Sequence, residues 1–258
     1  MTNERRVLVH PDMDALIGAV AARFLTKVID LLDESETINV VLTGGTVGGA
    51  VLHAVATSRM RDAIDWTRVH FWWGDERFVP KADPDRNELQ AREALLDHLP
   101  TPEANIHPFP ASDEIEDIER AAAAYADVLR EHAGSSTGVQ VPRFDITFLG
   151  VGPDGHIASL FPEHDSSRDS SLTVVAVRDA PKPPPLRLSL TMPAINSSDR
   201  IWMVLSGAEK ASALGLALAG ASPVEVPVAG AQGRKRTVFF VDDEAASQVP
   251  PNLIATQY

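Results

Sequence analysis

The 258-residue sequence contains no cysteine. Thiol catalysis, cysteine-based zinc sites and disulfide bonds are therefore excluded together, and the absence fits a reducing compartment. Long apolar runs are also missing, since no hydrophobic stretch approaches the roughly 20 residues that span a bilayer. The first twelve residues have no apolar region of the kind found in signal peptides. We therefore expect a cytoplasmic protein with no membrane partner.

Positive charge is scarce as well. The chain has 23 Lys and Arg against 36 Asp and Glu, which gives a formal net charge of -13. Such a surface repels polyanions, so nucleic acid is not an expected partner. It also repels phosphorylated metabolites, and any phosphate site must gather its own cations locally. Hydrophobic residues make up 44% of the chain, enough for a full globular core.

Short β-branched runs alternate with amphipathic stretches along the chain. We predict strands at Val7–His10, Ile38–Thr43, Val69–Trp73, Phe144–Gly150, Leu172–Val177, Arg187–Leu190, Ile201–Ser206 and Val238–Asp242. We predict helices at Asp14–Leu32, Ala50–Arg61, Glu88–Leu99, Ile115–His132 and Ala208–Leu218. This alternation indicates an α/β fold with a mostly parallel central sheet and helices on both faces.

Two stretches have the composition of linkers. Gly134–Gly138 is expected to be a disordered surface tip, and Pro181–Pro185 is stiff and polyproline-like. Neither separates two independently patterned halves, and the sequence shows no repeat. We therefore predict a single domain over residues 1–258.

A glycine-rich segment, Leu42–Gly49, ends a predicted strand and opens a predicted helix. Glycines let the backbone approach a ligand closely, and helix N–H groups favour an anion. No Gly-Lys-Ser/Thr follows, so the segment is not a Walker loop. Phosphate binding and a tight turn kept for packing both remain open on these residues alone.

Three adjacent charges, Asp75, Glu76 and Arg77, directly follow a strand too apolar to lie at the surface. The carboxyl ends of α/β strands are where such sheets bind ligands. The alternative is a solvated loop with an internal salt bridge.

The segment Phe144–Pro162 contains a literal G-x-G-x-x-G at Gly150, Gly152 and Gly155. We reject dinucleotide binding, because Asp154 within the motif would repel a pyrophosphate. His156 stands where the strand is expected to become a helix, and imidazole titrates near neutrality, which suits a general base. The other histidines lack such a setting and are expected at the surface or in the core: His10, His53, His70, His98, His107, His132 and His164.

Two cations late in the chain also stand out. Lys210 occupies the first turn of a predicted helix, where a cation is disfavoured unless an anion shares the site. Arg187 opens a predicted strand. The run Arg234–Arg236, by contrast, is interpreted as a solvated loop.

With these motifs assembled, the chain resembles the 6-phosphogluconolactonase family, within the group that includes glucosamine-6-phosphate isomerases and deaminases. The family's Ser-Gly-Gly-Ser-Thr-Pro loop corresponds to Thr43–Val47, although the expected proline is absent here. Its Asp-Glu-Arg-x-Val-Pro segment matches Asp75–Pro80, and its Gly-x-Asp-Gly-His-x-Ala-Ser-Leu-Phe-Pro segment matches Gly152–Pro162. The serine that usually precedes Asn87 is Arg86. The resemblance extends over effectively the full length.

The resemblance implies a Rossmann-like fold of the glucosamine-6-phosphate isomerase and ribose-5-phosphate isomerase type. It implies hydrolysis of 6-phospho-D-glucono-1,5-lactone in the oxidative pentose phosphate pathway, with a sugar-phosphate lactone as partner. Deaminase-like members carry Phe-Asn-Glu-Pro where this chain has Ser159–Pro162, so the branch glutamate is missing. An isomerase or deaminase, and a non-catalytic sugar-phosphate sensor, are the alternatives.

The site expected from this resemblance has His156 as general base, with Asp154 or Asp75 orienting it. Arg77 or the backbone near Gly152–Gly155 would stabilise the oxyanion. The phosphate would be held by Gly44, Gly45, Thr46, Arg187 and Lys210. No cofactor is expected, no metal site is expected because the histidines and carboxylates lack ligand spacing, and we expect a monomer.

Overall fold

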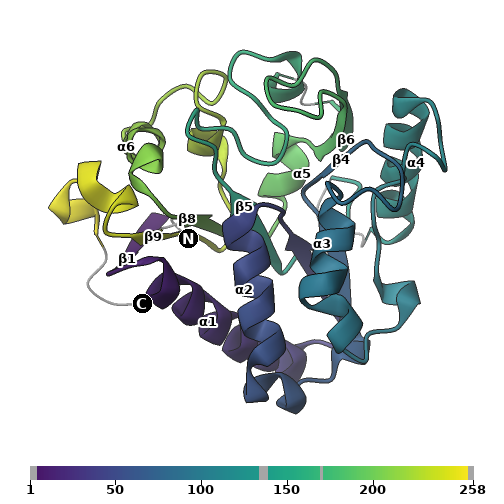
Figure 1. The fold of residues 1–258 in the computed structure, drawn as a ribbon, viewed down its shortest axis with the longest axis horizontal. Helices are drawn as coiled ribbons and strands as arrows, with labels where there is room; N and C mark the ends of the chain where they lie inside the picture. The colour runs from purple at the N-terminus through teal and green to yellow at the C-terminus, as the bar shows by residue number, and fades with distance from the viewer. Residues whose placement is uncertain (1–4, 134–138, 169–170, 255–258) are drawn as a thin grey trace.

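The computed structural model describes residues 5–133, 139–168 and 171–254, so the predicted tip at Gly134–Gly138 lies outside the described residues. The strands are β1 (Arg5–His10), β2 (Ile38–Leu42), β3 (Val69–Trp73), β4 (Asp75–Arg77), β5 (Ile146–Gly150), β6 (Val174–Val177), β7 (Arg187–Leu190), β8 (Arg200–Leu205) and β9 (Arg236–Asp242). The α-helices are α1 (Met13–Glu34), α2 (Thr46–Thr57), α3 (Asn87–Ala94), α4 (Ile118–Glu131), α5 (Met192–Asn196) and α6 (Ala211–Leu218). Short 3₁₀ turns connect several of them (Figure 1).

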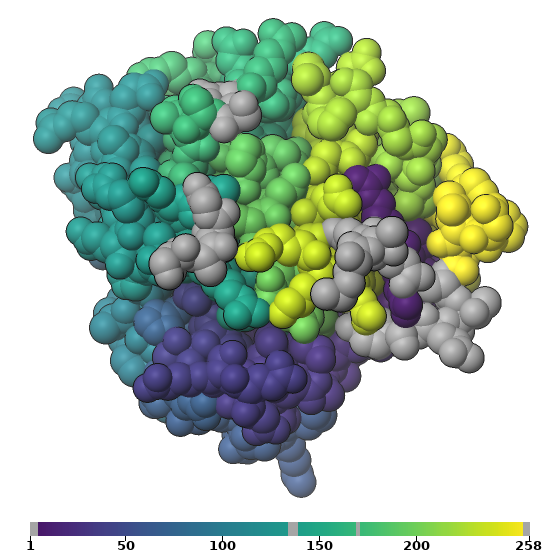
Figure 2. All heavy atoms as spheres, turned by 180° about the vertical axis from the view of Figure 1, so that it is seen from behind, coloured from purple at the N-terminus to yellow at the C-terminus, as the bar shows by residue number. Residues whose placement is uncertain are grey.

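The central sheet has six strands in the order β1-β9-β8-β5-β2-β3, and every neighbouring pair is parallel. The predicted α/β fold with a mostly parallel central sheet is therefore confirmed. The first strand of the chain, β1, pairs with the last, β9. Figure 2 shows the N-terminal segment lying between segments from the C-terminal part of the chain. A second, antiparallel sheet has the order β4-β7-β6.

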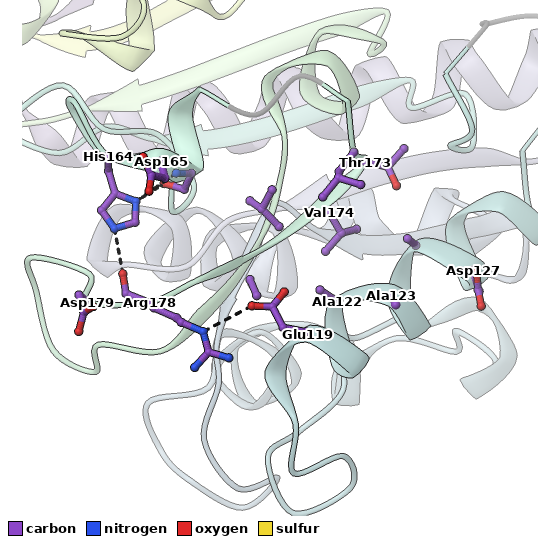
Figure 3. A pocket seen from close by; sticks show the side chains of 15 residues that line it. Glu119, Ala122, Ala123, Asp127, His164, Asp165, Thr173, Val174, Arg178 and Asp179 are labelled. Carbon is purple, nitrogen blue, oxygen red and sulfur yellow. Dashed lines mark hydrogen bonds and ion pairs between the residues drawn. The ribbon is translucent and has the colours of Figure 1, made fainter.

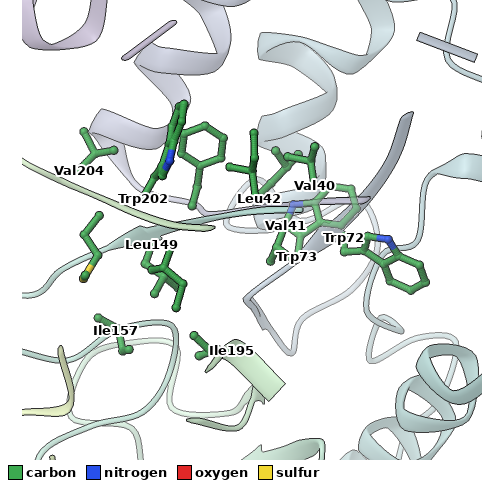
Figure 4. Packing of buried hydrophobic residues seen from close by; sticks show 14 of the residues in the cluster. Val40, Val41, Leu42, Trp72, Trp73, Leu149, Ile157, Ile195, Trp202 and Val204 are labelled. Carbon is green, nitrogen blue, oxygen red and sulfur yellow. The ribbon is translucent and has the colours of Figure 1, made fainter. Parts of the chain in front are cut away.

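The inner strands of the central sheet are apolar on both faces. The side chains of β5 and β8 are buried almost throughout, as expected for parallel strands covered on both sides. Trp202 and Val204 lie toward α1 and α2, whereas Leu149 lies on the opposite side, near Ile157 and Ile195 of α5 (Figure 4). This two-sided packing explains why continuous hydrophobic runs, and not alternating ones, predicted these strands.

Helix α1 illustrates how local signals set the element boundaries. Asp12 caps its start by accepting a 2.8 Å hydrogen bond from the N–H of Ala15. Its buried stripe, which includes Leu16, Val20 and Phe24, packs against the sheet at helical spacing. None of the helices in the described ranges combines the length and apolar character needed to cross a bilayer.

The differences from the predicted elements lie mainly in short segments. Strand β4 was not predicted, because three charged residues carry no hydrophobic pattern. The helix expected from Ala50 begins at Thr46, so it starts directly at the glycine-rich loop. The stretch expected as a strand from Leu172 becomes regular only at Val174.

The helix expected after His156 is absent. Val151 instead forms an antiparallel bridge with Ile157, and the N–H of Gly152 donates to the carbonyl of His156 at 2.9 Å. Ala158 then adopts a positive φ of 47°, which a right-handed helix does not allow. His156 therefore sits on a closed turn, and the prediction that it opens a helix is wrong.

Several of the remaining histidines stack beneath the sheet edge. The ring of His107 lies on Trp72 with centroids 3.9 Å apart, and its Nε2 lies 3.0 Å from Nδ1 of His70. The hydroxyl of Tyr125 donates to the carbonyl of His107. Burial, aided by the nearby rings of His132 and His70, lowers the pKa of His107 to about 4. His107 is buried, His70 is partly buried and His132 is exposed, in keeping with the expectation that these histidines lie in the core or at the surface.

Candidate active site

A cavity of about 290 Å³ lies at the carboxyl ends of the central strands. We call it the strand-end cavity. It is lined by segments that follow β2, β3, β5 and β8, together with the β6–β7 loop and the start of β7. Its lining residues are Thr43, Gly44, Gly45, Asp75, Arg77, Asn87, Gly150, Val151, Gly152, Pro153, His156, Ala158, Lys182, Pro183, Arg187 and Lys210. The structure thus brings most of the predicted site residues to one sheet edge.

The glycine-rich loop forms one wall of the strand-end cavity. Gly45 has a φ of 86°, a left-handed conformation that favours glycine, and it precedes the first residue of α2. Among the hydrogen bonds of the described residues, the N–H groups of Gly44 and Gly45 have no acceptor. Two free N–H groups at a helix start suit an anion. Thr46, which was also predicted to bind phosphate, does not line the cavity.

Position 44 has no room for a side chain, because Asn87 packs against it. A Cβ added there would overlap Oδ1 of Asn87, whose Nδ2 donates to the carbonyl of Asp75 at 2.9 Å. Asn87 is positioned in turn by Glu76, a fully buried carboxylate that accepts the N–H groups of Asn87 and Glu88 at 2.7 and 2.8 Å. Burial raises the pKa of Glu76 to about 7, against the lowering effect of Arg86 and of these N–H donors. Glu76 is therefore a cap of α3 and a support for the cavity wall.

His156 and Asp154 form a hydrogen-bonded pair. Nδ1 of His156 lies 2.6 Å from Oδ1 of Asp154. Burial opposes ionisation of Asp154, but the hydrogen bond and charge of His156, with a contribution from Lys182, lower its pKa to about 2. Asp154 is therefore an anion that accepts from Nδ1, which leaves Nε2 of the neutral imidazole as an acceptor. A side chain at position 152 would overlap both partners, so Gly152 provides the space for the pair.

Asp75, the other carboxylate considered for orienting the histidine, has a different partner. Its Oδ2 accepts a 2.7 Å hydrogen bond from the hydroxyl of Ser159, and the side chain is buried. Arg77 on the same strand donates from Nη1 to the carbonyl of Asp85, while its buried Nε has no acceptor among the described residues. Arg77 therefore lines the cavity with one donor of its guanidinium left without an acceptor among the described residues.

The remaining cations reach the cavity from later elements. Lys210 ends a 3₁₀ turn, Ala208–Lys210, that directly precedes α6, and burial lowers its pKa. Arg187 is buried and donates to the carbonyls of Lys182, Pro183 and Pro184, all at 3.1 Å. Lys182 was not predicted as a site residue. The one available signal was a lysine within an otherwise stiff proline run.

A second cavity, of about 650 Å³, lies between α4 and β6. We call it the α4–β6 cavity. Several of its polar groups interact with one another (Figure 3). Nε of Arg178 lies 3.4 Å from a carboxylate oxygen of Glu119. His164 forms hydrogen bonds through Nδ1 with the hydroxyl of Ser166 and through Nε2 with the carbonyl of Arg178. Alanine and valine side chains line much of the rest. Both ring nitrogens of His164, the histidine among the described residues that line this cavity, are therefore engaged.

Known proteins similar to this chain were found by sequence and by structure. The sequence profile of the glucosamine-6-phosphate isomerases/6-phosphogluconolactonase family matches residues 11–240. The chain is 47% identical over 255 residues to a 6-phosphogluconolactonase of Streptomyces coelicolor, covering 98% of each chain. It is 43% identical to a 6-phosphogluconolactonase of Mycobacterium tuberculosis, covering 94% of this chain and 97% of that one. A solved 6-phosphogluconolactonase from Trypanosoma brucei superposes with a TM-score of 0.84 at 26% identity, covering 96% of this chain and 100% of that one.

Proposed function

The chain belongs to the glucosamine-6-phosphate isomerase/6-phosphogluconolactonase family, and on this premise we propose that it hydrolyses 6-phospho-D-glucono-1,5-lactone to 6-phosphogluconate. It is a carboxylic ester hydrolase of the pentose phosphate pathway. The observation that carries the proposal is the His156–Asp154 pair, whose histidine lines a cavity together with glycines that have free backbone N–H groups and with cations. Such a site combines a general base with groups that bind an anion.

His156 acts as the general base. With Nδ1 bound to Asp154, Nε2 takes a proton from water as the water oxygen attacks the C1 carbonyl of the lactone. Collapse of the tetrahedral intermediate breaks the bond between C1 and the ring oxygen, and the imidazolium returns the proton to that oxygen. Asp154 holds the ring orientation and stabilises the transient imidazolium.

The developing oxyanion needs a donor that is already in position. The N–H groups of Gly152 and Gly155 donate to backbone carbonyls, at 2.9 and 3.0 Å, so they are engaged within the turn. Arg77 lines the cavity, and its Nε has no acceptor among the described residues, which supports Arg77 in this role. Asp75 is held by Ser159 and helps to fix the strand that carries Arg77.

The phosphate is held by the N–H groups of Gly44 and Gly45, with Arg187 and Lys210 supplying positive charge. Thr46 contributes its N–H as the first residue of α2. All these groups except Thr46 line the same cavity, and in a chain of net charge -13 a dianion needs such a local gathering of donors and cations. A cytoplasmic, monomeric enzyme is part of this proposal.

The test is a lactonase assay with purified protein, with spontaneous hydrolysis subtracted. We expect faster hydrolysis of 6-phosphogluconolactone, no release of ammonia from glucosamine 6-phosphate, and full activity after exhaustive chelation. The missing branch glutamate is the reason to expect no deaminase activity. Ammonia release at comparable efficiency would overturn the assignment, and a zinc-restored loss after chelation would show an overlooked metal site.

A further inference from the structure

Lys182 lies in the loop between β6 and β7, and its side chain lines the strand-end cavity. Its Nζ is 3.7 Å from Oδ1 of Asp154. The same oxygen accepts the 2.6 Å hydrogen bond from Nδ1 of His156. One carboxylate oxygen therefore faces both the ammonium and the imidazole, which brings a fixed positive charge close to the base.

Hydrogen bonds from Arg187 fix the backbone of the loop that carries Lys182. The buried guanidinium of Arg187 donates to three successive carbonyls, those of Lys182, Pro183 and Pro184. The N–H of Ala180 closes the loop by donating to the carbonyl of Pro185 at 3.0 Å. Because proline also restricts the backbone, the position of the Lys182 backbone is fixed at the cavity rim.

A cation near an imidazole disfavours the imidazolium, which is the form that cannot accept a proton. Lys182 also attracts the carboxylate of Asp154 and so weakens the pull of that anion on a protonated ring. The other charged groups that line the cavity come from separate elements: Lys210 before α6, Asp75 and Arg77 on β4, and Arg187 on β7. Glu209 lies outside the lining and pairs with Lys210 at 3.9 Å. Among the described contacts, Lys182 is the one whose ion pair shares the acceptor oxygen of His156.

We propose that Lys182 is a positioning residue that keeps His156 in its neutral, proton-accepting form by competing for the shared oxygen of Asp154. This inference rests on the proposed function, since it concerns the same base. It assigns to the proline-rich loop an electrostatic role that is separate from holding the phosphate.

The test compares Lys182→Met, which keeps the length and loses the charge, with Lys182→Arg, which keeps the charge. Lys235→Met is a matched control, because Lys235 pairs with Asp199 at the opposite end of β8. The substrate is unphosphorylated glucono-1,5-lactone, since a phosphate group titrates near pH 6 and would contribute its own limb. We expect Lys182→Met to move the acidic limb of kcat/KM to higher pH by about half a unit to one unit at low salt. In Lys182→Arg the acidic limb should lie close to its wild-type pH, and in Lys235→Met its pH should be unchanged.

The His156 ring is followed independently by NMR titration, assigned by comparison with His156→Ala. A matching shift of the ring titration in Lys182→Met supports the inference even for a protein that fails to hydrolyse lactones, which separates it from the proposed function. An unchanged limb and ring titration in active Lys182→Met would overturn it. So would a loss confined to KM for the phosphorylated lactone, which would make Lys182 a phosphate ligand.

Discussion

The strand-end cavity has less than half the volume of the α4–β6 cavity, about 290 against 650 Å³, yet it holds the reactive groups. The difference lies in how the polar groups are used. In the α4–β6 cavity, His164 has partners on both ring nitrogens. In the strand-end cavity, His156 has a partner on Nδ1, and two backbone N–H groups have none among the described residues. Free hydrogen-bonding capacity, and not volume, marks the site.

The largest expected effect distinguishes the histidines of the two cavities, His156 and His164. His156→Ala should lower kcat by roughly 10²–10⁴ and abolish the acidic limb of the pH-rate profile, because the general base is gone. His164→Ala, in the α4–β6 cavity, should keep kcat within about twofold, since it contacts no group of the proposed chemistry. Steady-state kinetics on the phosphorylated lactone measures both. Near-wild-type kcat in His156→Ala, or an equal loss in His164→Ala, would break the comparison.

The next effect concerns the cations. Lys210→Ala should raise KM for the phosphorylated lactone by about 10–150-fold, the value of a charge-assisted hydrogen bond of roughly 1.5–3 kcal/mol. Turnover of unphosphorylated gluconolactone, which lacks the contact, should barely change. Arg178→Ala is the matched control, because Arg178 lies in the α4–β6 cavity and pairs with Glu119. Equal losses on both lactones in Lys210→Ala would assign this lysine to the fold or to the oxyanion.

A smaller effect tests the tight wall of the strand-end cavity. Gly44→Ala should lower the free energy of unfolding by about 1–3 kcal/mol, because the new methyl group would overlap the buried amide of Asn87. Gly49→Ala, inside α2 with nothing within 4 Å of the added Cβ, should be neutral or stabilising by up to about 1 kcal/mol. Urea denaturation of both variants provides the measurement. Equal stability of the two would show that Asn87 moves aside freely.

Much of the fold and the convergence of the site could be predicted from the sequence. Buried parallel strands such as Val69–Trp73 are continuous apolar runs, and strand ends in such a sheet share one edge, so Gly44, Arg77, His156 and Lys210 were expected together. Hydrophobic periodicity carries this information because burial is what selects those residues.

The missed features depend on contacts between distant segments. Lys182 is remote in sequence from Asp154, and a single lysine among prolines has no periodic pattern. Asp75 and Asp154 were equal candidates to orient the base, because sequence spacing does not reveal that Ser159 occupies one of them. The turn at His156 escaped prediction since it is closed by the bridge between Val151 and Ile157, a local hydrogen-bonding arrangement without a compositional signature.

The stacked histidines beneath the sheet edge link the stability of the enzyme to proton concentration. The pKa of His107 is about 4 in the folded protein, against about 6.5 in an unfolded chain. The unfolded chain therefore binds this proton more readily, so the stabilising contribution of the neutral ring is complete above about pH 6.5 and is lost as the pH falls from there toward 4. After allowance for solvent screening, the loss is of the order of 1–2 kcal/mol. Thermal melts from pH 7.5 to 4.5 should show a shallower decline for His107→Phe than for the wild type, and parallel declines would contradict this linkage. The acid limit of this enzyme is thus set partly by a ring that does not line the strand-end cavity.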